Sequence, residues 1–180
     1  IGGFYGINID DDRSRELIVR WFQYGVFCPV CRIHGVRRSN GEREPGTWVA
    51  NEPWSYGEEV YAILREQLHL RERLRPYIME QMRVARKRGP PPMRPLFFDF
   101  PEDPPTWDID DQFMFGPDYL VAPVLEYGAR VRKVYLPVGS TWRDAWRGEV
   151  HQGGQWLEVA APLEQIPVFL RDDANLPIRA

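Results

Sequence analysis

Apolar residues recur with a helical period in the first part of the chain. Those of the first run share one helix face and are Leu17, Ile18, Trp21 and Phe22. The pattern predicts a helix over Ser14–Tyr24 that ends at Gly25, because glycine commonly follows the last turn of a helix. Three aspartates, residues 10–12, precede this run, and their charge suits the positive end of the helix dipole. We expect them to cap the helix, with a metal site as the weaker alternative.

A second, longer run of helical period extends from about residue 55 to Arg88. Ser55 and Glu58 have the Ser-x-x-Glu spacing of a capping box, which predicts the start of this helix. Pro76 lies inside the run and is expected to kink or split it, because proline has no backbone N–H to donate. Gly89 is expected to end it.

Short apolar segments precede and separate these helices. Residues 1–12 are predicted to hold the end of a strand followed by a loop, and Val26–Val30 is predicted to be a buried strand. Residues 36–54 form a long loop of mixed charge, and loops of this length are often functional. The order strand, helix, strand, helix is typical of the last units of an α/β barrel or of a doubly wound sheet.

The period becomes strand-like after the three prolines at 90–92. The predicted strands are separated by turn residues and are Leu96–Phe100, Tyr119–Val124, Val131–Leu136, Gln155–Val159 and Ile166–Arg171. Several short strands at close spacing predict a small antiparallel β-sandwich. The predicted fold class is therefore α/β plus all-β, with an α/β part over residues 1–89 and a β-sandwich over residues 90–180.

Composition and charge exclude several classes of protein. The chain has 180 residues with 43% hydrophobic and 27% charged residues, which is ordinary globular usage and excludes disorder over its length. No apolar run approaches the roughly 18 residues that span a bilayer, so no membrane partner is expected. The net charge of -3 argues against a nucleic-acid partner, because that affinity depends on concentrated positive charge.

Cys28 and Cys31 form a Cys-x-x-Cys motif, which can be a redox pair or half of a zinc site. They are the only 2 cysteines in the chain, so no second pair completes a zinc cage. A redox pair works best at a helix N-terminus, whereas this pair follows the end of a predicted helix. Two structural thiols are therefore the favoured interpretation, and a thiol-redox protein is an alternative function.

His34 lies where a predicted strand gives way to a loop, so it could contact a ligand or be a structural residue. The other histidines, His69 and His151, show no spacing that joins it in a metal site or a catalytic triad. Gly2 and Gly3 lack the spacing of a dinucleotide or phosphate loop, so no cofactor or metal is expected. The residues alone lead to an α/β segment joined to a β-sandwich, with Trp and Tyr faces that suit sugars.

Several collinear motifs resemble the late barrel segment and following domain of glycoside hydrolase family 31. They begin with Ile-Gly-Gly-Phe at 1–4, and continue with Val19–Pro29, Arg-Ile-His-Gly at 32–35, Glu52–Gly57, Arg73–Tyr77, Met93–Leu96, Asp111–Pro117, Leu120–Val124, Val134–Pro137, Ala161–Leu163 and Ile166–Phe169. The amino-acid sequences of these motifs are most similar to those of α-xylosidase-like and α-glucosidase-like members.

The resemblance implies the last βα units of a (β/α)8 barrel followed by a β-sandwich. It also implies a retaining α-glycosidase that uses two aspartates, one as nucleophile and one as general acid/base, on an α-linked oligosaccharide or glycoside. The family's catalytic aspartates precede its Ile-Gly-Gly-Phe motif, so both are expected upstream of Ile1, with no catalytic residue in this chain. The chain alone is expected to be a C-terminal, inactive part of such an enzyme.

The resemblance also assigns substrate-binding residues. Phe4 matches the aromatic wall of the subsite for the non-reducing sugar, and His34 matches the histidine that hydrogen-bonds the hydroxyls of that sugar. Arg32 matches a position that orients neighbouring carboxylates. Whether the sugar is xylose or glucose stays open at this point. The alternative function is a carbohydrate-binding β-sandwich module without catalysis.

Overall fold

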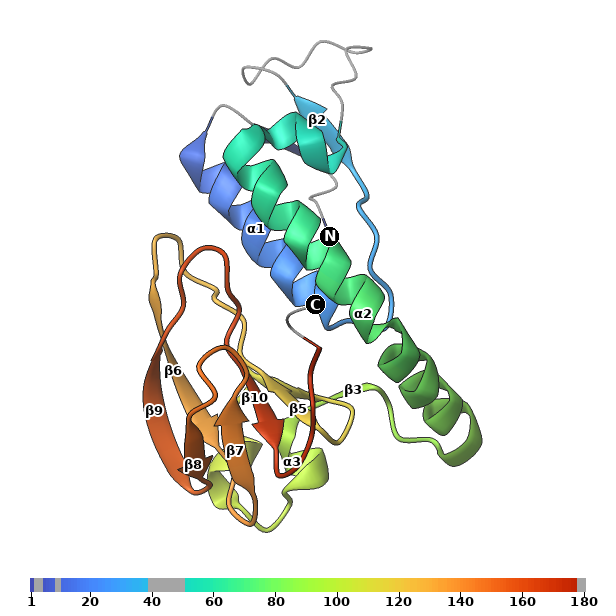
Figure 1. Ribbon diagram of the computed structural model, residues 1–180, viewed down its shortest axis with the longest axis vertical. Helices are drawn as coiled ribbons and strands as arrows, with labels where there is room; N and C mark the ends of the chain where they lie inside the picture. The colour runs from blue at the N-terminus through green and yellow to red at the C-terminus, as the bar shows by residue number, and fades with distance from the viewer. Residues whose placement is uncertain (2–4, 9–10, 39–50, 178–180) are drawn as a thin grey trace.

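The structure is a computed structural model that describes residues 1, 5–8, 11–38 and 51–177 (Figure 1). Its first part contains β1 (Tyr5–Asn8), α1 (Asp12–Val26) and β2 (Val36–Arg38). β1 and β2 pair in parallel, with Tyr5 opposite Val36, and α1 is the crossover between them. This strand–helix–strand unit confirms the predicted α/β character, and no closed barrel is present within the described part of the chain.

α1 and α2 (Glu58–Arg88) lie side by side and run in the same direction (Figure 1). Their contact is a buried apolar cluster that also includes Tyr56 of η1 (Pro53–Tyr56). The fully buried members from the two helices include Ile18, Val19, Phe22 and Leu64. The apolar face predicted for the first helix is therefore mostly correct. Leu17 is the exception, because it is exposed and is not part of the cluster between α1 and α2.

The end of α1 differs from the prediction. The helix continues through Gly25 to Val26 and is capped at Phe27, whose N–H donates to the carbonyl oxygen of Tyr24, while the N–H of Cys28 donates to that of Gly25. Val26–Val30 is a helix end followed by a turn rather than a strand. Val26 and Phe27 are buried because they pack against α2 and the β-domain, and this tertiary burial explains the apolar run. At the other end Asp11 is the N-cap and accepts the N–H of Arg13 at 3.1 Å, as predicted.

The start of α2 also differs from the prediction. Gly57 is the N-cap with φ 91°, a left-handed conformation that favours glycine, and Ser55 is one residue of η1 instead of a capping residue. The Ser55 hydroxyl donates to the carbonyl oxygen of Glu52. Pro76 does not split the helix, whereas Gly89 ends it with φ 95° as predicted.

The second part is an antiparallel β-domain, which confirms the predicted class. Its six-stranded sheet has the order β3-β4-β5-β10-β7-β8, and β6 pairs with β9 in a separate two-stranded sheet. The strands are β3 (Met93–Arg94), β4 (Phe113–Phe115), β5 (Tyr119–Val121), β6 (Val131–Leu136), β7 (Thr141–Asp144), β8 (Val150–Gln152), β9 (Gln155–Ala160) and β10 (Val168–Arg171).

Two expectations about this domain were wrong in detail. Leu96–Phe100 is not a strand, because Leu96–Asp99 forms the short helix α3 with Pro95 as its N-cap. Four short strands, β3, β4, β7 and β8, were not predicted, and η2 (Pro104–Trp107) follows α3. The division at residues 89 and 90 stays a prediction.

The six-stranded sheet separates two apolar layers because its side chains alternate between faces. On one face Phe115, Val121 and Leu170 pack with residues of α1 and α2. On the other face Met114, Leu120, Trp142 and Phe169 pack with residues of β6 and β9. The sheet therefore joins the helices to the two-stranded sheet through continuous buried contacts. No helix in the described ranges is long and apolar enough to span a membrane.

Candidate functional site

The segment that carries Arg32 and His34 lies beside the start of the chain. The Ile1 ammonium donates to the carbonyl oxygen of Arg32 at 2.9 Å, and the His34 N–H donates to the carbonyl oxygen of Ile1 at 2.9 Å. The structure thus brings Arg32 and His34, which precede β2, next to Ile1, and the Arg32 and His34 side chains are both exposed.

Phe4, the third predicted substrate-binding residue, lies outside the described residues. The predicted loop over residues 36–54 is described only in part, and its first three residues form β2. His34 is the predicted sugar-contacting side chain that can be placed, and its imidazole can donate or accept a hydrogen bond.

Arg71 of α2 holds the turn that leads to Arg32. Its guanidinium donates to the carbonyl oxygens of Val26 at 2.7 Å and Pro29 at 3.0 Å, and also to that of Cys28. A helix C-terminus leaves carbonyl groups without helical partners, and Arg71 supplies donors for them. The sequence motifs gave no sign of this contact, because the partners are more than 40 residues apart.

Gly25 allows α1 to approach the same segment closely. A Cβ atom at this position would lie 3.1 Å from Cγ2 of Ile1 and 3.3 Å from the Cys31 sulfur. Those distances are shorter than ordinary van der Waals contacts, so a larger residue would push the strand segments away from α1. Gly25 therefore serves close packing within the helix rather than helix termination.

Cys28 and Cys31 are free and half-buried in this turn. Burial raises the pKa of both thiols, and the nearby charge of Arg71 does not compensate for it. A raised pKa disfavours the thiolate that redox chemistry needs. The geometry therefore favours structural thiols over the redox alternative. Within the described ranges, no group of three or more His, Cys, Asp and Glu residues could hold a metal ion.

A cluster of charges joins α1 to the β-domain, with Glu16 and Arg20 buried and Arg130 exposed. Glu16 of α1, which is 7% exposed, accepts two hydrogen bonds from Arg130, at 2.7 Å on Oε1 and 3.0 Å on Oε2. It also accepts the N–H of Gly128 at 3.2 Å. Burial by itself raises the pKa of Glu16, but these hydrogen bonds and the charges of Arg130 and Arg20 outweigh it and lower the pKa below 4.5.

Arg20 lies one helical turn after Glu16 and is 6% exposed. Its guanidinium donates to four backbone carbonyls of the β-domain, at distances of 3.0–3.2 Å, on Ala129, Ala161, Pro162 and Gln165. Gln23, a further turn along, donates to the carbonyl oxygen of Leu163 at 2.6 Å. Three polar residues on one face of α1 therefore fix the β-domain against the crossover helix that connects β1 to β2.

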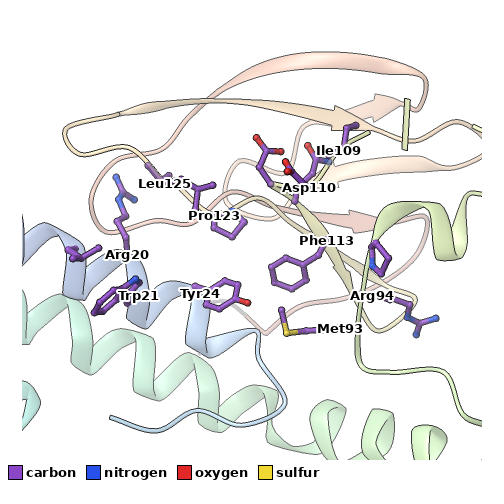
Figure 2. A pocket seen from close by; sticks show the side chains of 15 residues that line it. Arg20, Trp21, Tyr24, Met93, Arg94, Ile109, Asp110, Phe113, Pro123 and Leu125 are labelled. Atoms are coloured by element: carbon purple, nitrogen blue, oxygen red, sulfur yellow. The ribbon is translucent and has the colours of Figure 1, made fainter. Parts of the chain in front are cut away.

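A cavity of about 510 Å³ lies between α1 and the β-domain (Figure 2). Figure 2 shows Trp21 and Tyr24 rising from α1 on one side, with Phe113 and Pro123 on the opposite side. Asp110 also lines it. Arg32 and His34 are not among its lining residues. Sequence reasoning missed this cavity, because its walls come from segments that are about 90 residues apart.

Two family models together match most of the chain. Residues 1–81 match the TIM-barrel domain of glycosyl hydrolases family 31, and residues 89–175 match the family 31 C-terminal domain. The chain belongs to glycoside hydrolase family 31. The two matches agree with the strand–helix–strand unit at the start and the antiparallel domain that follows it, and they confirm the resemblance drawn from the sequence motifs.

The chain is similar in sequence to two named glycosidases. It is 37% identical over 177 residues to an alpha-xylosidase of Saccharolobus solfataricus, covering 98% of this chain and 23% of that protein. It is 34% identical over 181 residues to alpha-glucosidase 2 of Bacillus thermoamyloliquefaciens, covering 99% of this chain and 21% of that one. The chain thus spans between a fifth and a quarter of the length of these relatives.

A solved structure supports the same assignment. The crystal structure of a family 31 alpha-xylosidase from a soil metagenome, complexed with xylose, superposes on this chain with a TM-score of 0.91. The two sequences are 53% identical, and the match covers 98% of this chain and 27% of that protein. Fold and sequence therefore agree over nearly the whole family 31 chain.

Proposed function

We propose that this chain supplies part of the sugar-binding site of a retaining α-glycosidase that removes terminal α-linked xylosyl or glucosyl residues. The observation that carries the proposal is the backbone pairing of Ile1 with Arg32 and His34 at 2.9 Å. This pairing places the start of the chain beside the segment that precedes β2. Arg32 and His34 precede β2 and do not follow a strand as expected, so their place in the sugar site is taken from the Arg-Ile-His-Gly motif at 32–35 that resembles the family.

Each predicted residue has a chemical role in this proposal. The exposed His34 imidazole hydrogen-bonds hydroxyl groups of the non-reducing sugar, and Phe4 gives that sugar an aromatic wall. Arg32 orients carboxylates near the sugar through its fixed fork of N–H donors. Arg71 and Gly25 do not contact the sugar in this proposal. They position the His34 segment, because Arg71 holds the turn before it and Gly25 allows close packing of α1.

The reaction itself would use two aspartates from barrel strands outside these 180 residues. One carboxylate attacks the anomeric carbon while the other protonates the departing oxygen, which leaves a covalent glycosyl-enzyme. The second carboxylate then takes a proton from water, and the water oxygen displaces the first aspartate. Retention of configuration requires the two carboxyl groups to lie about 5–5.5 Å apart. Residues 1–89 would belong to the barrel and residues 90–180 to the β-sandwich domain.

The sugar class is taken from the relatives. Proteins named alpha-xylosidase and alpha-glucosidase are both similar to this chain, and the soil-metagenome alpha-xylosidase structure holds xylose. A glucosyl unit differs from a xylosyl unit by one hydroxymethyl group, so either sugar presents the same ring hydroxyls to His34.

The test is hydrolysis of 4-nitrophenyl α-xyloside and α-glucoside by the whole protein that carries these residues. We expect release of at least one sugar, with the α-anomer appearing first by proton NMR, and no turnover by the 180 residues alone. Initial release of the β-anomer, failure on both substrates, or turnover by the 180 residues alone would contradict the proposal.

A further inference from the structure

One segment of the β-domain, residues 161–165, is bound by side chains of both α1 and α2. Arg20 of α1 donates to its first, second and fifth backbone carbonyl oxygens at 3.0–3.1 Å. Gln23 of α1 donates to the third at 2.6 Å, and Gln67 of α2 donates to the fourth at 3.2 Å. Five consecutive carbonyl groups of the β-domain are therefore held by the two helices.

Neighbouring residues of this segment connect one helix to the other. Leu163 accepts from Gln23 of α1 and Glu164 accepts from Gln67 of α2, and both glutamines are buried. The side chain of Leu163 also packs against the apolar cluster between α1 and α2. Adjacent carbonyl groups are a fixed distance apart along the backbone. The segment therefore fixes the spacing of α1 and α2 at this level of the helices.

Arg71 relates this spacing to the segment that carries His34. It lies one helical turn after Gln67 on the same side of α2, and its guanidinium crosses to the end of α1. There it donates to the carbonyl oxygens of Val26 at 2.7 Å and Pro29 at 3.0 Å. Hydrogen bonds of this kind need donor–acceptor distances of roughly 2.7–3.2 Å, so they are kept only while the two helices keep their spacing. The turn that they hold leads to His34.

We propose that the segment 161–165 positions His34 in the sugar site by fixing the spacing of α1 and α2, with Gln67 as the positioning residue on α2. Gln67 acts through Arg71 and the turn that Arg71 holds, and it does not contact the sugar. The β-domain thereby contributes to hydrolysis without placing a residue against the substrate. The inference rests on the proposed function for the role of His34.

The test is a double-variant cycle on kcat/KM in the whole protein, with a 4-nitrophenyl α-glycoside and at a temperature where every variant is folded. Gln67→Met removes the donor and keeps a side chain of similar length. We expect it to lower kcat/KM about three- to tenfold, because a small displacement of a binding group is costly. In a His34→Ala background the same change is expected to have almost no effect, since it acts through His34.

Two outcomes of the cycle would overturn the inference. One is an unchanged kcat/KM in Gln67→Met when His34 is present. The other is an equal decrease with and without His34, which is the result of a contact that only attaches the β-domain. Gln23→Met removes the donor to the neighbouring carbonyl from the α1 side, and the same cycle with it decides the matter if Gln67→Met does not fold.

Gln112→Met is the matched control for the loss of a buried glutamine. Gln112 is 3% exposed, and its side chain donates to the carbonyl oxygen of Tyr135 at 2.7 Å and accepts its N–H at 2.9 Å, all within the β-domain. We expect Gln112→Met to lower the unfolding temperature and to leave kcat/KM unchanged while it is folded. A decrease in kcat/KM equal to that of Gln67→Met would overturn the inference.

Hydrogen–deuterium exchange of residues 26–34 in the whole protein gives a readout that does not depend on hydrolysis. This stretch includes the His34 N–H, which donates to the carbonyl oxygen of Ile1 at 2.9 Å. We expect faster deuterium uptake here in Gln67→Met than in Gln112→Met or the unmodified protein. Unchanged uptake in Gln67→Met would overturn the inference. If uptake rises but the whole protein hydrolyses no α-glycoside, the proposed function fails and the link from Gln67 to the His34 segment stands.

Discussion

Arg130 binds both oxygens of Glu16, with Nη1 2.7 Å from Oε1 and Nη2 3.0 Å from Oε2. The two residues are 114 positions apart, and the pair connects the crossover helix of the barrel part to the β-domain. A two-point contact of this kind restricts both rotation and translation. The β-domain is therefore attached to the helix on which the β1–β2 pair depends.

Glu16→Gln is expected to lower the free energy of unfolding by about 2–3 kcal/mol. The amide can accept only part of the bidentate pair and leaves the buried guanidinium of Arg20 without its nearby negative charge. Urea denaturation of the 180-residue chain measures the effect. Glu72→Gln is the control, because Glu72 pairs with Arg75 on the exposed face of α2, where an ion pair contributes less than about 1 kcal/mol. Equal effects of the two variants would contradict the account.

The same carboxylate predicts a loss of stability in acid. The folded-state pKa of Glu16 lies below 4.5, so its contribution is fully present above that pH and is lost as the pH falls through the lower folded value. Unfolding free energies measured from neutral pH to about pH 3 should therefore decline more in the unmodified chain than in Glu16→Gln. Parallel pH profiles of the two chains would show that the Glu16 pKa is not lowered.

Tyr135 predicts a loss of stability in alkali, whereas Glu16 predicts one in acid. Burial, followed by the hydrogen bond to Asp103 and its charge, raises the pKa of Tyr135 from 10.0 to about 12. The neutral phenol is the favoured folded form, so its stabilisation is present below pH 10 and is lost as the pH rises through about 12. Tyr135→Phe should cost about 1–2 kcal/mol at neutral pH and reduce the alkaline decline. Tyr127→Phe, at an exposed tyrosine, should do neither.

The two cysteines should react slowly in the folded chain. Burial raises the pKa of Cys28 and Cys31, which lowers the thiolate fraction at neutral pH. Alkylation by iodoacetamide is expected to be slower in the native chain than in the same chain in urea, as followed by mass spectrometry. Faster alkylation in the native chain than in urea would contradict this prediction and favour the redox interpretation.

The parts of the fold that sequence predicted well are those with a strong local period. The α1 and α2 runs, the capping Asp11 and the terminating Gly89 could all be identified from spacing and residue type. The antiparallel domain could be recognised because turn residues separate its strands. The four strands that were not predicted have two to four residues, such as Met93–Arg94, and lack the longer apolar runs that surround the equally short β5 and β10.

The errors have two physical causes, which are tertiary packing and local backbone preference. Val26 and Phe27 look like a strand because they are apolar, but they are buried by α2 and by the sheet. The Ser55–Glu58 spacing is met, yet Pro53 begins a 3-10 helix and Gly57 takes the capping position. The Arg20 contacts and the cavity could not be predicted, because their partners are brought together only by the complete fold.

The most direct test of the account is the kcat/KM of His34→Ala for an aryl α-xyloside or α-glucoside in the whole protein. If His34 hydrogen-bonds the sugar, transition-state stabilisation falls by about 1–3 kcal/mol, which corresponds to a decrease of about 5- to 150-fold. His69→Ala, at an exposed histidine of α2, controls for loss of the imidazole and should leave kcat/KM unchanged. An unchanged kcat/KM in His34→Ala would contradict the central claim that this segment contacts the substrate.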